Sequence, residues 1–403
     1  MSNESFAHLL RLTGAAPPPA PALYDDSWPG VLRRGLQTAL NALELLRSRG
    51  TFVAVEGAGV AVATGLVRAG TATSMRALLG GARVLRGGRL ARLADQLAID
   101  SCSQLELFLA TEDVLIVFGE RSGKALAIHV SANDAHLERQ KRGMETAREV
   151  LAQCPAADLV PRLVERRQID GAWALIQKRL VGRNVDPAEL SATELETYIE
   201  AALGPLLYLD SLANTDDKGP DHEIICAGFR SIEMHPVLAA QLAHPLAALR
   251  NWSAERRQWR MVFAHGDYWF QNLLFAKDGS PVLTGILDWE RCRTRALPGA
   301  DALYLVAFAF SRWHGCPQFK VLCDIWDGAC DPLLERLVDR LLAAFRISID
   351  DLRFIAILMW LMHLRLRVPW MTEWPAARHQ EWITLPVESI GRWLSRRESS
   401  LDR

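Results

Sequence analysis

The chain has 403 residues, half of them hydrophobic, and its formal net charge is −1 at pH 7. This length exceeds the size at which one hydrophobic core usually stops growing, so two or three packed units are expected. The balanced charge gives no global attraction to nucleic acid or acidic membranes, which excludes both as partners except through a local patch.

Cysteine usage and hydropathy bear on the compartment. The seven cysteines are scattered, with no CxxC pair, which indicates reduced thiols. The N-terminus begins polar and lacks the basic and apolar regions of a signal peptide. The most apolar window, residues 52–67, contains Glu56 and is too short to span a bilayer comfortably. We therefore expect a cytoplasmic protein without a transmembrane segment.

Residues 1–102 are predicted to form a mainly helical extension of unknown role. A proline-rich arm over 1–30 is followed by an amphipathic helix over 31–47, and TFVAVEGAG then predicts a buried strand that ends in a glycine turn, with a helix beyond it. The segment Arg76–Arg92 carries five arginines and no acid. It predicts either weak contact with a membrane surface or an acidic partner, or a solvated face whose arginines pair elsewhere.

Short apolar runs begin near residue 103. The runs at 105–110, 114–119 and 124–130 are separated by polar turns and predict an antiparallel meander. A helix over 135–152 and two further strands, RLVERRQI and WALIQKRLVG, complete this region.

Helical patterns dominate the remaining chain. The first helix, over 186–212, has a capping box at Ser191 and Glu194, and Pro205 is expected to kink it. Further helices are predicted at 236–252, 303–312, 332–346 and 351–367. The tryptophans of the C-terminal part either pack between helices or stack on an acceptor molecule.

The stretch from Met261 to Glu290 predicts a hairpin. Apolar runs at 273–275 and 282–287 flank a turn at Asp278-Gly279, so the outer ends of the hairpin should meet. Asn272 and Asp288 occupy those ends, and their oxygens suit Mg²⁺, which takes a few hard ligands plus substrate phosphates.

A second polar group lies just before the hairpin. The chain breaks at His265-Gly266-Asp267, where the glycine permits a sharp turn. The Asp267 carboxylate can therefore meet a substrate proton while the hairpin ends hold the metal.

Through HGDYWFQN at 265–272 and ILDWE at 286–290, the sequence resembles the aminoglycoside phosphotransferase and choline kinase group of the protein-kinase-like superfamily. The resemblance implies ATP-dependent transfer of a phosphoryl group to a small-molecule hydroxyl. It implies that Asp267 is the catalytic base, that Asn272 and Asp288 are Mg²⁺ ligands, and that His265 supports the loop. Asp301, in PGADALYL, matches the acid that braces this loop.

The same resemblance implies an α+β bilobal fold. Residues 103–180 would form the small nucleotide-binding lobe, and residues 181–403 the large catalytic lobe with a helical C-terminal acceptor region. The lobes would join through 177–180, where backbone groups ordinarily receive adenine, which brings Gln177 and Arg179 to the nucleotide.

The small lobe departs from the family pattern at the phosphate side. His129 stands where the family has a lysine, Glu145 fits the helix acid that would pair with that lysine, and the loop 110–113 lacks glycine. His129 is either an imidazolium facing phosphates or a neutral core residue.

We predict a phosphotransferase that uses ATP and Mg²⁺ on a sugar, amino alcohol or similar acceptor. The alternative is a kinase-like nucleotide-binding or scaffolding protein without turnover.

Overall fold

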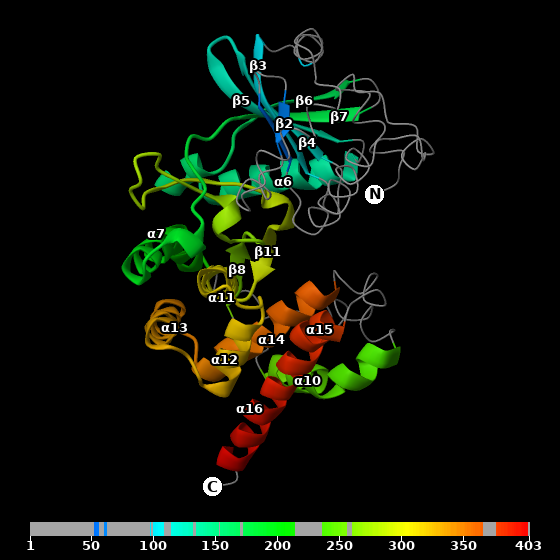
Figure 1. Ribbon diagram of the computed structural model, residues 1–403, viewed down its shortest axis with the longest axis vertical. Helices are drawn as coiled ribbons and strands as arrows, with labels where there is room; N and C mark the ends of the chain where they lie inside the picture. The colour runs from blue at the N-terminus through cyan, green and yellow to red at the C-terminus, as the bar shows by residue number, and fades with distance from the viewer. Residues whose placement is uncertain are drawn as a thin grey trace, which may run out of the picture. The chain divides into compact units, whose positions relative to one another are not determined.

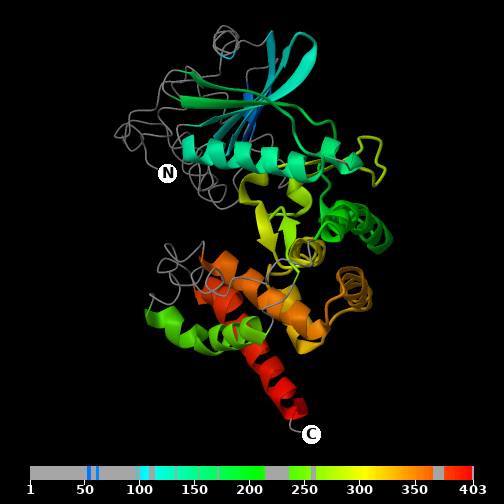
Figure 2. The same cartoon turned by 180° about the vertical axis from the view of Figure 1, so that it is seen from behind.

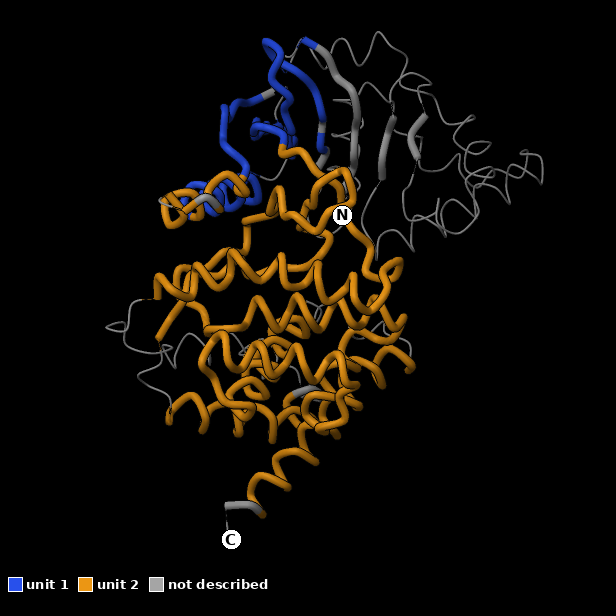
Figure 3. Tube along the Cα trace, turned by 90° about the vertical axis from the view of Figure 1, so that its left-hand side faces the viewer, with its two compact units in different colours: residues 1–146, 161–179 blue, residues 147–160, 180–403 orange. Residues whose placement is uncertain are grey.

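The structure is a computed structural model. It describes residues 97, 100–108, 114–131, 134–152, 154–169, 172–213, 236–255, 260–365 and 376–401, together with short strands at 52–55 and 60–62. The predicted helix at 31–47 and the segment Arg76–Arg92 lie outside these residues. The chain divides into two compact units (Figure 3). Unit 1 comprises residues 1–146 and 161–179, and unit 2 comprises residues 147–160 and 180–403.

Unit 1 contains a seven-stranded antiparallel sheet with the order β2-β1-β3-β4-β5-β7-β6 (Figure 1). Its strands are β1 (Phe52–Val55), β2 (Val60–Val62), β3 (Ser101–Phe108), β4 (Val114–Arg121), β5 (Lys124–Ser131), β6 (Leu163–Ile169) and β7 (Ala172–Lys178). The predicted meander is confirmed as β3–β4–β5. The β4–β5 turn holds Ser122 and Gly123 at positive φ, which a tight two-residue turn requires.

Helix α6 (Asp134–Val150) follows β5 and runs along the sheet (Figures 1 and 2). Ion pairs from Arg166 of β6 to Asp134 and Glu138 tie the start of this helix to the sheet. The buried face of α6 includes Leu137 and Met144, which are at most 1% exposed. The predicted helix and the two strands after it are therefore confirmed.

The N-terminal segment adds strands to this sheet. The strand predicted from TFVAVEGAG is present as β1, which pairs with β3 so that Ala54 faces Leu105. The element directly after the glycine turn is β2, which pairs with β1. The helix expected beyond it would fall in residues 63–96, which lie outside the described residues. The predicted five-stranded sheet therefore has seven strands, because β1 continues the hydrogen-bond ladder at the edge of β3.

Unit 2 is mainly helical (Figure 1). Its α-helices are α7 (Ala192–Ser211), α10 (Pro236–Glu255), α11 (Ala300–His314), α12 (Lys320–Asp327), α13 (Pro332–Phe345), α14 (Ile349–Arg365), α15 (Ala376–His379) and α16 (Leu385–Leu401), with a π-helix, η7 (Gln380–Thr384), between the last two. Helices α7, α10, α11, α13 and α14 were predicted. Helices α12 and α16, which pack against each other, were not.

Local sequence signals explain the best-defined ends of these helices. In α7 both bonds of the capping box are present, because Ser191 Oγ accepts from the Glu194 N–H and the Glu194 carboxylate accepts from the Ser191 N–H. Asp331 caps α13 by accepting from two backbone N–H groups. Glycines at positive φ end α11 and α12.

Two tryptophans of the C-terminal part lie in the core of unit 2. Trp360 and Trp393 are at most 2% exposed. The Trp360 indole donates to the Trp382 carbonyl at 2.8 Å, and Trp393 packs edge-on against Phe354. For these residues the structure supports packing between helices. Among the described helices, none is long and apolar enough to cross a bilayer.

Candidate functional site

Two short antiparallel pairs hold the loop 265–272 in unit 2. Strand β8 (Val262–Ala264) enters the loop and pairs with β11 (Arg293–Ala296). The loop ends in the 3-10 turn η4 (Phe270–Asn272), which leads into the predicted hairpin, β9 (Leu273–Phe275) with β10 (Leu283–Ile286). Both sides of the loop are thus fixed by sheet hydrogen bonds, a suitable base for a positioned side chain.

Asp301 and His265 brace the backbone of the loop. The Asp301 carboxylate accepts from the backbone N–H groups of His265 at 2.6 Å and Gly266 at 3.0 Å. The His265 Nε2 lies 2.7 Å from the Leu287 carbonyl, and its Nδ1 accepts from the Asp267 N–H at 3.2 Å. A carbonyl can only accept, so the imidazole is the neutral Nε2–H tautomer. Burial lowers the pKa of His265, against the opposing effects of Asp301 and Asp267, in agreement with this tautomer.

Gly266 is required by the close approach of two backbone segments. Its φ is +80°, and a Cβ at this position would lie 2.3 Å from the Arg291 carbonyl oxygen. Only glycine satisfies both conditions. The approach brings Arg291 beside the loop.

The Asp267 carboxylate is held by two side chains. Tyr304 of α11 donates its hydroxyl hydrogen to Oδ1 at 2.8 Å, and Arg291 Nη1 lies 4.0 Å from Oδ2. Burial, with the Asp267 charge adding to it, raises the pKa of Tyr304 well above its usual value, so the phenol stays protonated and donates. The Asp267 side chain remains 14% exposed, which leaves it within reach of a substrate.

The hairpin brings the predicted metal ligands to adjacent ends. The Leu287 N–H donates to the Asn272 carbonyl at 2.8 Å, so Asp288 follows directly after the pairing that ends at Asn272. The Asn272 amide nitrogen donates to the Asp267 carbonyl at 2.9 Å, which fixes the orientation of the amide and leaves its oxygen as the group available to a cation.

The backbone of Asp288 is unusual for a non-glycine residue. It adopts the left-handed region, with φ 62° and ψ 63°, directly before the 3-10 turn η5 (Trp289–Arg291). Such conformations cost energy and occur preferentially at functional sites. No group of three or more His, Cys, Asp or Glu that could hold a metal occurs within the described part of the chain. One amide oxygen and one carboxylate therefore fit a hard cation that takes its other ligands from water and substrate phosphates.

The predicted nucleotide residue His129 lies in unit 1 and is uncharged. Its Nε2 is 3.1 Å from the amide nitrogen of Gln177, whose side chain is 3% exposed. Burial, with a smaller effect from the charge of His136, lowers the pKa of His129 to about 3. A neutral imidazole that is hydrogen-bonded to Gln177 agrees with the core alternative.

The other two predicted nucleotide residues have local partners within unit 1. Glu145 is exposed on α6 and pairs with Lys141 at 3.4 Å. The Arg179 guanidinium lies 4.2 Å from the ring centroid of Phe118. The N–H groups of Lys178 and Arg179 donate to the carbonyls of Arg162 and Ala125. These two N–H groups are therefore engaged in sheet pairing, and the predicted adenine contacts at this segment stay predictions.

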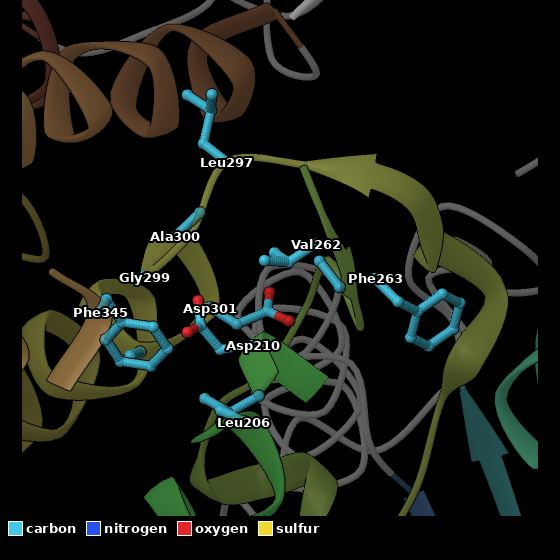
Figure 4. Close-up of a pocket in the computed structure, with 11 residues that line it drawn as sticks. Leu206, Asp210, Val262, Phe263, Leu297, Gly299, Ala300, Asp301 and Phe345 are labelled. Atoms are coloured by element: carbon cyan, nitrogen blue, oxygen red, sulfur yellow. The ribbon is translucent and has the colours of Figure 1, made fainter. Parts of the chain in front are cut away.

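A small cavity lies behind the loop. Asp301 and Asp210 both line it, with apolar side chains that include Leu206 and Phe345 (Figure 4). Asp210 of α7 accepts from Arg260 at 2.7 Å, and Arg260 also donates to the Phe345 carbonyl at the end of α13. Arg260, which lies two residues before β8, therefore bonds both α7 and the end of α13.

Sequence reasoning missed two side chains at the site. Tyr304 is 37 residues from its partner Asp267, and no local pattern indicates that contact. Arg291 carried a weak signal, because it directly follows the ILDWE segment.

Comparison with known proteins gives a family for this chain. The model of the phosphotransferase enzyme family matches residues 124–355, which is more than half of the chain. A search of curated proteins found no match. Among solved structures, aminoglycoside phosphotransferase APH(4)-Ia is 18% identical, with a TM-score of 0.52 over 75% of this chain and 99% of its own.

Two further solved structures have a similar fold. A thermostable mutant of APH(4)-Ia in complex with ADP and hygromycin B is 16% identical, with a TM-score of 0.51 over 74% of this chain and 98% of its own. The microcompartment-associated aminopropanol kinase is 15% identical, with a TM-score of 0.50 over 75% of this chain and 97% of its own. These likenesses confirm the predicted kinase-like α+β fold. The chain belongs to the phosphotransferase enzyme family.

Proposed function

We propose that the protein transfers the γ-phosphoryl group of ATP to a hydroxyl of a small molecule, with Mg²⁺ held by Asn272 and Asp288. The observation that carries this proposal is the juxtaposition of a positioned carboxylate, Asp267, with the joined ends of the β9–β10 hairpin. Phosphoryl transfer depends mainly on positioning and charge neutralisation, which such an arrangement supplies.

Each residue of the loop has a role in this reaction. Asp267 accepts the proton of the acceptor hydroxyl, a contribution of typically about 10²–10⁴-fold. Tyr304 and Arg291 orient its carboxylate. Mg²⁺ bound at Asn272 and Asp288 would supply positive charge to the phosphates. His265 and Asp301 keep the backbone of the loop in place and contact no substrate.

The donor nucleotide is proposed to bind unit 1. His129, Gln177 and Arg179 would contact it, and His129 would do so as a neutral hydrogen-bonding group. Glu145 would join them only if it exchanged Lys141 for another partner. The mutant of APH(4)-Ia binds ADP and hygromycin B in one solved complex, which supports a nucleotide and a small molecule as the two ligands of this chain. Together with the aminopropanol kinase, it supports a sugar or amino alcohol as the acceptor class.

The test combines binding with turnover. Calorimetry and thermal shift with ATP and Mg²⁺ measure binding, and phosphate transfer is followed with hygromycin B, aminopropanol and a panel of sugars, amino alcohols and nucleosides. Asp267→Asn should abolish transfer and leave MgATP binding nearly intact, because an amide keeps the shape of the side chain and cannot take a proton. Asp288→Ala should weaken nucleotide binding only when the metal is present.

Asp278→Ala is the matched control. This carboxylate lies in the turn at the other end of the same hairpin, and its removal should change neither binding nor transfer. Parental turnover by both Asp267→Asn and Asp288→Ala would overturn the site assignment. Nucleotide binding without transfer to any acceptor or to water would support the scaffolding alternative.

A further inference from the structure

The chain from η5 into β11 brings two arginines to the loop that carries Asp267. Arg291 Nη1 lies 4.0 Å from Asp267 Oδ2. Arg293, the first residue of β11, pairs with Ala264, the last residue of β8, where the loop begins. The sheet pairing that fixes the loop therefore also fixes the backbone of Arg293 beside it.

A third arginine comes from α14. Arg293 Nη1 lies 3.5 Å from the sulfur of Met362. The imidazole of His363, the next residue of this helix, lies 3.2 Å from the hydroxyl of Tyr304 at the site. This end of α14 therefore borders the site. Arg365 is three positions after Met362, so the two residues lie on one face of the helix.

Arg293 has only a weak partner. Arg291 lies near two carboxylates, that of Asp267 and that of Glu290, the second at 3.7 Å. Within the described part of the chain, the Arg293 guanidinium contacts the Met362 thioether and no carboxylate. A thioether is a weak acceptor, so the exposed side chain of Arg293 keeps most of its N–H groups for another ligand.

The charges around Arg293 favour an anion. Partial desolvation lowers the pKa of Arg293, and the positive charges of Arg365 and Arg291 lower it further, against the opposing effect of Asp301. Arginine stays protonated in proteins, so these like charges persist and repel one another. Arg365 also complements the C-terminal end of α14, which gives it a structural role. A carboxylate or phosphate on Arg293 would offset the repulsion, and a guanidinium binds either group through paired hydrogen bonds.

We propose that the acceptor is a hydroxy compound with an anionic group, a carboxylate or a phosphate, which Arg293 binds beside Asp267. This inference rests on the proposed function and names the acceptor class of the same site. The acceptor oxygen bonds to the γ-phosphorus as the bond from that phosphorus to ADP breaks, and the hydroxyl proton goes to Asp267. A sugar acid or a sugar phosphate fits this site, whereas the amine of an amino alcohol would meet like charge on Arg293.

The kinetic test compares acceptors that share hydroxyl groups and differ in charge. The pairs are glycerate with glycerol, glucuronate with glucose, and glucose 6-phosphate with glucose, so that carboxylate and phosphate are tested separately. Transfer from MgATP is measured as release of ADP. In the parent, kcat/KM should be higher for the anionic member of the carboxylate pairs, the phosphate pair or both.

Substitutions at Arg293 test which side chain produces this preference. Arg293→Gln should lower the ratio of kcat/KM, anionic over neutral acceptor, at least about 10-fold, because charge-assisted hydrogen bonds are lost. Arg293→Lys keeps the charge and should retain more of the ratio than Arg293→Gln. Arg336→Gln is the control, since this exposed arginine of α13 pairs with Glu196 of α7, and it should keep the parental ratio.

Three kinetic results would overturn the inference and leave the proposed function in place. The first is equal or higher kcat/KM for the neutral acceptors, or for aminopropanol, in the parent. The second is an unchanged ratio in Arg293→Gln. The third is an equal loss for both members of each pair in Arg293→Gln with a raised KM for ATP, which would assign Arg293 to the phosphates of the donor.

A binding experiment keeps the two proposals separate if no acceptor is phosphorylated. With MgADP present, glycerate, glycerol, glucose 6-phosphate and glucose are titrated by calorimetry into the parent and Arg293→Gln. Tighter binding of the anionic members, reduced at least about 10-fold in Arg293→Gln, would support the anion site while the absence of transfer overturned the proposed function. Equal binding of charged and neutral members by the parent would overturn the inference.

Discussion

At the scale of single residues, His129 shows how burial changes what a side chain can do. A lysine at this position would offer phosphates a permanent charge, whereas His129 has a pKa lowered to about 3 by burial. Its partner is the amide of Gln177. The residue can therefore contribute a hydrogen bond at neutral pH, and no positive charge.

This lowered pKa predicts a pH dependence of stability. Above pH 6.5 the imidazole is neutral in the folded and unfolded states, and it contributes no slope. Between about pH 6.5 and about 3 the unfolded chain binds a proton that the folded chain does not, so stability falls as pH falls. One such group adds about 1.4 kcal/mol per pH unit to the slope of the free energy of unfolding against pH. This value applies well below the pKa that the group has in the unfolded chain. We expect His129→Gln to reduce the slope by about this amount between pH 6 and pH 4.5, in urea unfolding of parent and variant.

Other buried groups titrate in the same pH range. The quantity to measure is therefore the difference in slope between the parent and His129→Gln. His265 contributes in the same direction, because burial also lowers its pKa. His244→Gln, at an exposed histidine on α10, is the control variant. Equal slopes in His129→Gln and the parent would mean that His129 is solvated and titrates normally in the folded protein.

Elements were predicted well where the signal was local. The hairpin of β9 and β10 follows from two apolar runs and an Asp-Gly turn, and α7 follows from its capping box. Contacts such as Tyr304 to Asp267 depend on how α11 packs behind the loop, and no short-range pattern contains that information. Helix α12 is only eight residues long, and so short a helix gives a weak periodic signal.

At the scale of elements, the ion pair of Arg260 and Asp210 predicts a large stability effect. Asp210 is 5% exposed, and burial raises its pKa against the opposing effect of Arg260. Arg260→Met should cost about 3–5 kcal/mol, because it leaves a buried carboxylate without its partner. Replacing Asp210 by Leu as well should recover part of this loss. Chemical unfolding of the single and double variants measures both effects.

An exposed ion pair between α7 and α13 gives the control. Arg340 of α13 pairs with Glu200 of α7, and their side chains are 46% and 48% exposed. Arg340→Met should therefore cost no more than about 1 kcal/mol. Equal losses in Arg260→Met and Arg340→Met would show that burial of Asp210 does not determine the effect.

At the scale of the whole molecule, the sheet of unit 1 begins before the point at which the sequence suggested a boundary. Residues 1–102 were expected to form a mainly helical extension, with the small lobe beginning at residue 103. Strand β1 instead pairs with β3 on one side and β2 on the other. Leu97 is fully buried, and its carbonyl accepts from Arg121 of β4 at 3.0 Å.

We therefore expect removal of residues 1–98 to destabilise unit 1. The truncation leaves the eight-residue strand β3 as an unpaired edge, with backbone groups open to pairing with other copies. It should lower the melting temperature and increase aggregation, as followed by calorimetry and light scattering.

Ala54→Pro in the full chain separates loss of pairing from loss of the rest of the segment. Because β1 is paired on both sides, a proline there removes a ladder hydrogen bond, and the variant should be destabilised in the same direction. A monomeric truncated protein with the parental melting temperature would mean that unit 1 is complete from β3 onward and that β1 and β2 only cover its edge.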